Sequence, residues 1–196
     1  MSQSREVTTR GVVIGRAQAG EGSVRIFLYT EEKGLVGALA KSAREERSKL
    51  RPHLQIGSYG SYTLVKGSYD WRLVGAVDTN NSYFLLSEKK EAQEASARVL
   101  SVLRQLIQGE DMNTNLFQTL WNFLSVLATL SSEEIYIAER LAMVRILSSL
   151  GYVPTLRNIP HLEGDTFEVA SLQELEPFKK ELVKTINDAL LASGLS

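Results

Sequence analysis

The sequence predicts an α+β protein of two domains, a five-stranded β-barrel followed by an all-α helical domain. Ten of the fourteen glycines lie within residues 1–80, where short β-branched and aromatic runs alternate with turns. From residue 81 on, glycine is rare and apolar residues recur every three or four positions, which is the period of an amphipathic helix. We therefore expect domains at residues 1–80 and 81–196.

Composition limits the classes of protein that the chain can belong to. The 196 residues are 43% hydrophobic and include two histidines and no cysteine, a profile typical of a globular protein. Without cysteine, disulfide frameworks and cysteine-containing zinc sites are excluded, and we expect neither a metal nor a cofactor. The N-terminus lacks the apolar core of a signal peptide, and no apolar run is long enough to span a membrane. We therefore expect a cytoplasmic protein.

Five strands are predicted in the first domain, at residues 7–16, 24–30, 35–41, 55–65 and 71–77. In the second strand, Val24, Ile26 and Leu28 fall on one face, which should be buried. Residues 42–54 show no strand pattern and are expected to form a loop with a helical turn. Three strands, a connection and two further strands are the order of an OB-fold.

Four helices are predicted in the second domain. Capping and stop signals place them from Ser87 to Gly109, from Asn113 past Leu127, from the capping box at Ser131–Glu134 to Leu150, and from Pro177 or Phe178 to Ala192. Residues 153–165, with two prolines, should be irregular. The apolar stripe of the second helix is interpreted as core, and the acidic helical domain as a protein-docking module.

The charge is divided unevenly between the two halves. Residues 1–80 carry 12 basic and 8 acidic side chains, whereas residues 81–196 carry 10 basic and 15 acidic ones. A basic domain joined to an acidic one indicates that the first binds a polyanion and that the second binds something else.

The connection at residues 41–51 concentrates positive charge, because it holds five cations and two anions. Long flexible cations in an exposed loop can follow a phosphate backbone, and aromatic rings beside a basic groove can stack on bases. The candidate contacts are Lys41, Arg44, Arg47, Lys49 and Arg51, with Tyr69 and Trp71 as stacking residues. The alternative is that Arg44 and Arg47 pair with Glu45, Glu46 or their neighbours on a solvated face.

Catalytic motifs are missing from the sequence. It contains no phosphate-binding GxxxxGK[ST] loop, no GxGxxG turn and no GxSxG elbow. His53 and His161 each lie near a proline in a predicted loop, with no partner nearby that would orient the ring. We therefore expect a protein that is not an enzyme.

Several segments follow one another in an order known from a bacterial protein family. They are Thr9–Ile14, Gly20–Gly34, Ala40–Arg44 followed by Ser48–Leu50 and His53–Gln55, and Leu147–Leu156. In this order and spacing the chain resembles the RecO recombination-repair mediator proteins. By that resemblance Lys41, Arg44 and Lys49 fall on the basic connection that contacts DNA. Arg47 and Arg51 are added for their charge alone.

The resemblance implies an N-terminal OB-fold, a C-terminal helical domain and a role in DNA repair and homologous recombination. Family members bind single- and double-stranded DNA, anneal complementary strands and help to load recombinase, with a RecR protein and single-stranded-DNA-binding protein as partners. Many relatives hold a zinc ion with four cysteines, whereas residues 157–169 contain none here. The chain therefore resembles the shortened, zinc-free members. A partner-dependent adaptor and an RNA-binding OB-fold module remain as alternatives.

Overall fold

The computed structural model describes residues 6–45, 47–81, 86, 88–153 and 159–195. Its contacts divide the chain into two compact units. The barrel unit comprises residues 1–85 and 107–112, and the helical unit comprises residues 86–106 and 113–196. The predicted division after residue 80 therefore differs from these units, because residues 107–112 belong to the barrel unit.

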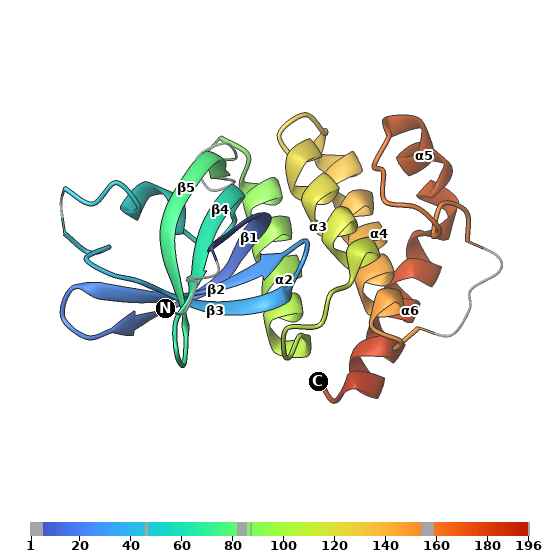
Figure 1. The fold of residues 1–196 in the computed structure, drawn as a ribbon. Coiled ribbons are helices and arrows are strands. Elements are labelled where there is room, and N and C mark those ends of the chain that lie inside the picture. The colour runs from blue at the N-terminus through green and yellow to red at the C-terminus, as the bar shows by residue number, and fades with distance from the viewer. Residues whose placement is uncertain (1–5, 46, 82–85, 87, 154–158, 196) are drawn as a thin grey trace. The chain divides into compact units, whose positions relative to one another are not determined.

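Five strands form the barrel unit (Figure 1). They are β1 (Glu6–Ala19), β2 (Ser23–Thr30), β3 (Gly34–Ala40), β4 (Ser58–Lys66) and β5 (Trp71–Asn81). The sheet closes in the order β1-β2-β3-β5-β4. Neighbouring strands are antiparallel except for β3 and β5, which pair in parallel at Ala38 and Leu39. This closed five-stranded sheet confirms the predicted OB-like barrel.

The strand boundaries differ from the prediction mainly at three ends. β1 and β5 run three and four residues further than expected, to Ala19 and Asn81. β4 begins at Ser58 rather than Gln55, because Gly57 has a φ of +84° and the amide of Ser58 bonds back to Gln55. The predicted helical turn in the connection is present as the 3₁₀ helix η1 (Arg51–Leu54).

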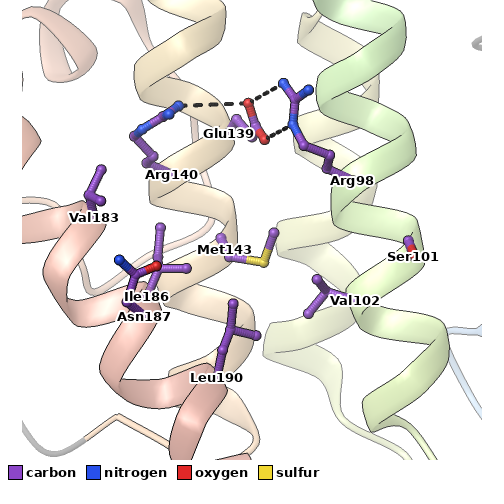
Figure 2. A pocket seen from close by; sticks show the side chains of 10 residues that line it. All are labelled: Arg98, Ser101, Val102, Glu139, Arg140, Met143, Val183, Ile186, Asn187 and Leu190. Atoms are coloured by element: carbon purple, nitrogen blue, oxygen red, sulfur yellow. Dashed lines mark hydrogen bonds and ion pairs between the residues drawn. The ribbon is translucent and has the colours of Figure 1, made fainter. Parts of the chain in front are cut away.

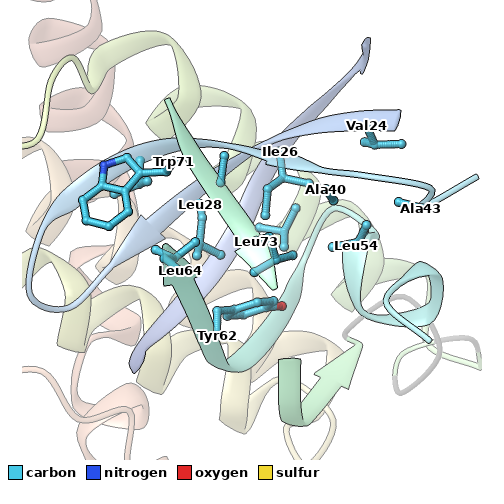
Figure 3. Packing of buried hydrophobic residues seen from close by; sticks show 13 residues of the cluster. Val24, Ile26, Leu28, Ala40, Ala43, Leu54, Tyr62, Leu64, Trp71 and Leu73 are labelled. Atoms are coloured by element: carbon cyan, nitrogen blue, oxygen red, sulfur yellow. The ribbon is translucent and has the colours of Figure 1, made fainter. Parts of the chain in front are cut away.

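The barrel core is built from the inward faces of these strands. Val24, Ile26 and Leu28 are all buried, as their alternation predicts, and they face Leu64 and Leu73 from β4 and β5 (Figure 3). Burial of such aliphatic side chains is the main force that closes a small barrel.

The helical unit contains five α helices and one short 3₁₀ turn among the described residues. They are α2 (Lys90–Leu106), α3 (Thr114–Val126), α4 (Ser132–Ser149), α5 (Val169–Glu174), η2 (Glu176–Phe178) and α6 (Lys179–Ser193). The capping box of Ser131 and Glu134 is formed, and Gly194 ends α6 in the left-handed conformation, as the sequence predicts. α5 was not predicted, because six residues are too few to show a helical period.

Two further predictions concern the helical unit. Phe117, Leu120 and Leu124 of α3 are buried, so the apolar stripe is core. Residues 159–165 form turns and bends without a helix, while residues 154–158 of the segment expected to be irregular lie outside the described residues. Within the part of the chain that the structure describes, no helix is both long and apolar enough to cross a membrane.

Candidate nucleic-acid interface

The connection between β3 and β4 is fastened to the barrel by its apolar residues. Ala43 and Leu54 are each 2% exposed within the barrel core, and Leu50 packs against the same core. The amide of Arg44 donates to the carbonyl of Gly22 at 3.1 Å, which ties the connection to the β1–β2 turn. The backbone of this loop is therefore held in place although it contains little regular structure.

The cations of this connection point away from the barrel. Lys41, Arg44, Arg47, Lys49 and Arg51 are all exposed, and none of them forms an ion pair with another described residue. The alternative pairing of Arg44 or Arg47 with Glu45 is therefore not present, whereas Glu46 lies outside the described residues. Five charges on an anchored loop, none of them paired with a described residue, form a surface that suits a phosphate backbone. We call these five side chains the cation loop.

A second polar region surrounds the turn between β4 and β5. Tyr69 on this turn is 98% exposed. Beside it, Asp70 accepts two hydrogen bonds from the guanidinium of Arg25, at 3.1 and 2.5 Å. This bidentate contact lowers the pKa of Asp70 below its usual value. Arg25 reaches across β3 over Gly37, where a Cβ atom would lie 3.6 Å from its terminal nitrogen.

Trp71 does not provide the stacking surface that the sequence predicts. Its side chain belongs to the barrel core and the residue is only 5% exposed. The indole Nε1 donates to the carboxylate of Glu110 at 3.0 Å. Since a base needs an open ring face to stack, Trp71 is a core residue with a polar edge, and Tyr69 is the better candidate.

The predicted site residues therefore fall into two places on the barrel. The cation loop follows β3, whereas Tyr69 lies on the turn between β4 and β5, and Figure 1 shows these segments well apart. Other aromatic side chains of the strands do not join them, because Tyr29, Tyr59 and Tyr62 are buried. Phe27 on β2 is half-buried.

The sequence reasoning missed two charged residues of this surface. Arg25 could have been found from the alternation in β2, which turns it outward with Phe27. Glu110 could not have been found in this way, because it lies in the segment between α2 and α3. Only the folded structure brings it into contact with Trp71.

The two histidines have structural partners. The ring of His53 hydrogen-bonds the hydroxyl of Thr79, and that of His161 contacts the carboxylate of Glu174 at 2.7 Å. Within the described ranges, no cluster of three histidine, aspartate or glutamate side chains could hold a metal ion.

The helical unit carries a groove of about 350 Å³ between α2, α4 and α6 (Figure 2). Its walls are mainly apolar and include Val102, Met143 and Ile186. At one end Glu139 accepts two hydrogen bonds from Arg98, at 2.6 and 2.9 Å. The groove has the size and lining of a site for a side chain or a short peptide.

Comparisons with known proteins point to one family. The family described as "Recombination protein O N terminal" matches residues 1–71. The chain is 29% identical over 146 residues to the DNA repair protein RecO of Acetivibrio thermocellus, covering 74% of this chain and 57% of the relative. It is 25% identical over 157 residues to the RecO of Dehalococcoides mccartyi, covering 80% of this chain and 61% of the relative.

A shorter match has a similar identity. The DNA repair protein RecO of Salinibacter ruber is 30% identical over 112 residues, which is 57% of this chain and 43% of the relative. In the two longer matches the aligned region amounts to about three fifths of the relative's length.

Proposed function

Because this chain belongs to the RecO family of DNA repair and recombination proteins, we propose that it binds single- and double-stranded DNA and anneals complementary strands. It acts without catalysing a reaction of its own and helps to load recombinase together with protein partners. The cytoplasm, where bacterial DNA lies, is its proposed location.

The observation that carries this proposal is the cation loop. Lys41, Arg44, Arg47, Lys49 and Arg51 project from a backbone that Ala43 and Leu54 hold against the core. Neutralising phosphates with such side chains releases counterions, which supplies most of the affinity for a nucleic acid of any sequence. Because two DNA strands repel each other, a cationic surface that binds both also lowers the cost of bringing them together.

The stacking role belongs to Tyr69 in this proposal. Its exposed ring offers a face to an unpaired base, and the stacking of bases on aromatic rings depends little on the nucleotide sequence. The exposed Arg72 of β5 adds positive charge close to the same turn.

The proposed protein partners are a RecR-like protein and single-stranded-DNA-binding protein. The helical unit is their proposed docking module, since it is acidic overall and carries the groove between α2, α4 and α6.

A salt titration tests DNA binding directly. Fluorescence anisotropy of a labelled single-stranded oligonucleotide, measured at several salt concentrations, should give a log–log slope of roughly −3 for four or five phosphate contacts. Reversing charge at Lys41, Arg44 and Lys49 together should flatten the slope by about 2.

A matched control separates the site from net charge. Reversing the exposed lysines Lys90, Lys180 and Lys184 of the helical unit changes the total charge equally and should leave the slope nearly unchanged. Equal effects of the two triple variants would refute the assigned site. Binding to RNA in preference to DNA of the same sequence would favour the RNA-binding alternative.

A further inference from the structure

A carboxylate of the chain lies among cations beside Trp71. Oε1 of Glu110 accepts a hydrogen bond from the indole Nε1 of Trp71 at 3.0 Å and lies 3.4 Å from Nζ of Lys66. The ammonium of Lys66 is 4.7 Å from the centre of the Trp71 ring, and that of Lys33 is 5.5 Å from it. The Glu110 carboxylate thus contacts an N–H donor and one ammonium group, and a second ammonium lies close to the same indole ring.

The backbone that carries Glu110 is locked onto the barrel unit. Leu35 donates its amide to the carbonyl of Gly109 at 3.2 Å. A Cβ atom on Gly34, whose φ is +60°, would lie only 2.2 Å from the carbonyl oxygen of Asp111, so only glycine allows this approach. The segment is therefore placed by specific contacts.

The side chain of Glu110, in contrast, is half exposed, with a relative accessibility of 49%. Because about half of its surface is open to solvent, it can leave Lys66 by rotating without any movement of the backbone. Lys66 is similarly open, at 45%. An exposed ion pair of this kind is worth little and is easily exchanged for another partner.

The geometry points to a phosphate subsite that Glu110 occupies when no nucleic acid is bound. An N–H donor and an ammonium group that converge on one oxygen, with a second ammonium beside the same indole ring, can bind a phosphate oxygen in the same way. We propose that a backbone phosphate of the bound strand replaces the Glu110 carboxylate on Lys66 and Trp71. This inference rests on the proposed DNA binding and adds that residues 107–112 carry a built-in competitor that weakens it.

The position of the subsite suits a strand that also reaches Tyr69. Lys66 ends β4 and pairs in register with Trp71 at the start of β5. Tyr69 lies on the turn that joins these two residues, so the phosphate subsite and the exposed ring flank one short turn. A strand whose base stacks on Tyr69 carries its own phosphates past Lys66.

The test is Glu110→Gln, which keeps the size of the side chain and an acceptor for Trp71 but removes the charge. It should raise the affinity for single-stranded DNA roughly fivefold at 50 mM salt and steepen the log–log slope by about 0.7, the contribution of one phosphate on a single strand. The matched control is Glu32→Gln, an exposed carboxylate of the β2–β3 turn that makes no hydrogen bond or ion pair to Lys66 or Trp71. It should change the affinity less than twofold.

The Lys66→Gln background shows whether the effect passes through the subsite. There, Glu110→Gln should raise the affinity no more than Glu32→Gln does. In addition, the indole N–H resonance of Trp71 should shift when the oligonucleotide is added to the wild-type protein, whereas that of Trp121 should not.

The outcomes distinguish this inference from the function on which it rests. Salt-dependent binding by the wild type with equal effects of Glu110→Gln and Glu32→Gln overturns the subsite and leaves DNA binding standing. An effect of Glu110→Gln that survives in the Lys66→Gln background also overturns the subsite. If none of the variants binds DNA, both the proposed function and the subsite fail.

Discussion

The barrel unit and the helical unit differ in whether they bury charged side chains. Among the described residues, the buried polar side chains of the barrel unit are the neutral Thr9, Thr30 and Ser58, whereas the helical unit buries Glu139 and Arg145. A strand turns every second side chain outward, so a barrel can keep its charges in solvent. α4 contacts α2, α3 and α6, and charged residues on its covered sides must find partners inside.

This difference separates charges that can bind a ligand from charges that hold the fold. The five side chains of the cation loop have no described ionic partner and are free to meet phosphates. Arg145, in contrast, donates to the carbonyls of His161 and Thr166, at 2.6 and 2.8 Å, and lies 4.9 Å from the ring centre of Phe167. Its role is to hold the irregular segment before α5 against α4.

Removing Arg145 should therefore have the largest effect on stability. Arg145→Leu keeps an apolar stem but leaves two carbonyl oxygens without their donor, which should cost about 2–5 kcal/mol of unfolding free energy. Urea denaturation measures the change. Arg140→Leu on the same helix is the control and should cost less, because Arg140 is bonded to Tyr136 of its own helix. Equal losses of unfolding free energy in the two variants would show that the buried contacts of Arg145 do not contribute more to stability than those of Arg140.

The barrel unit should become sensitive to charge at alkaline pH. Burial raises the pKa of Tyr29 to about 12, against about 10 in an unfolded chain. The folded state therefore holds the phenolic proton more tightly, so stability that is fully present below pH 10 is lost as the pH rises towards 12. The loss should reach up to about 3 kcal/mol.

The Tyr29→Phe variant isolates this effect. Denaturation curves recorded between pH 8 and 12 should show a smaller fall in stability for Tyr29→Phe than for the wild type. A fall of the same size in both proteins would assign the alkaline transition to other groups, such as Tyr62, whose pKa burial also raises.

A pair of glutamates compares the two units directly. Glu139 has a side chain that is 10% exposed and bonds Arg98, whereas Glu31 of the barrel unit is 27% exposed and bonds Arg10. Glu139→Gln should lower the unfolding free energy by about 1–2 kcal/mol. Glu31→Gln should lower it by less than about 1 kcal/mol, because solvent screens the pair of Glu31 and Arg10 more strongly. Thermal unfolding of the two variants in parallel checks the order, and a larger effect at Glu31 would contradict it.

The fold could be predicted from the sequence because the signals that define it are local. The alternation of Val24, Ile26 and Leu28 and the capping box at Ser131 each depend on residues a few positions apart. The return of residues 107–112 to the barrel could not be predicted, since it depends on the shape of the Gly34 turn and on Asp111, far along the chain.

The candidate site could be predicted only in part for the same reason. A run of cations such as 41–51 is visible in the sequence, whereas its anchoring by Ala43 and Leu54 is a tertiary property. Tyr69 and Trp71 look alike as aromatic residues beside a turn. The fold separates them, because Tyr69 lies on the turn and is exposed, whereas Trp71 begins β5 and packs into the barrel core.

Replacing Tyr69 is expected to have the smallest effect on stability, and it tests whether an exposed side chain of the barrel unit serves binding rather than folding. Because its ring is 98% exposed, Tyr69→Ala should leave the unfolding midpoint unchanged. It should nevertheless weaken binding to single-stranded DNA by about 1–3 kcal/mol, the usual contribution of one base stacked on an aromatic ring. Tyr69→Phe keeps the ring and should bind as the wild type does. Anisotropy titrations of the wild type and the two variants measure this difference in affinity. A Tyr69→Ala variant that binds with wild-type affinity would show that the barrel unit binds DNA through charge alone.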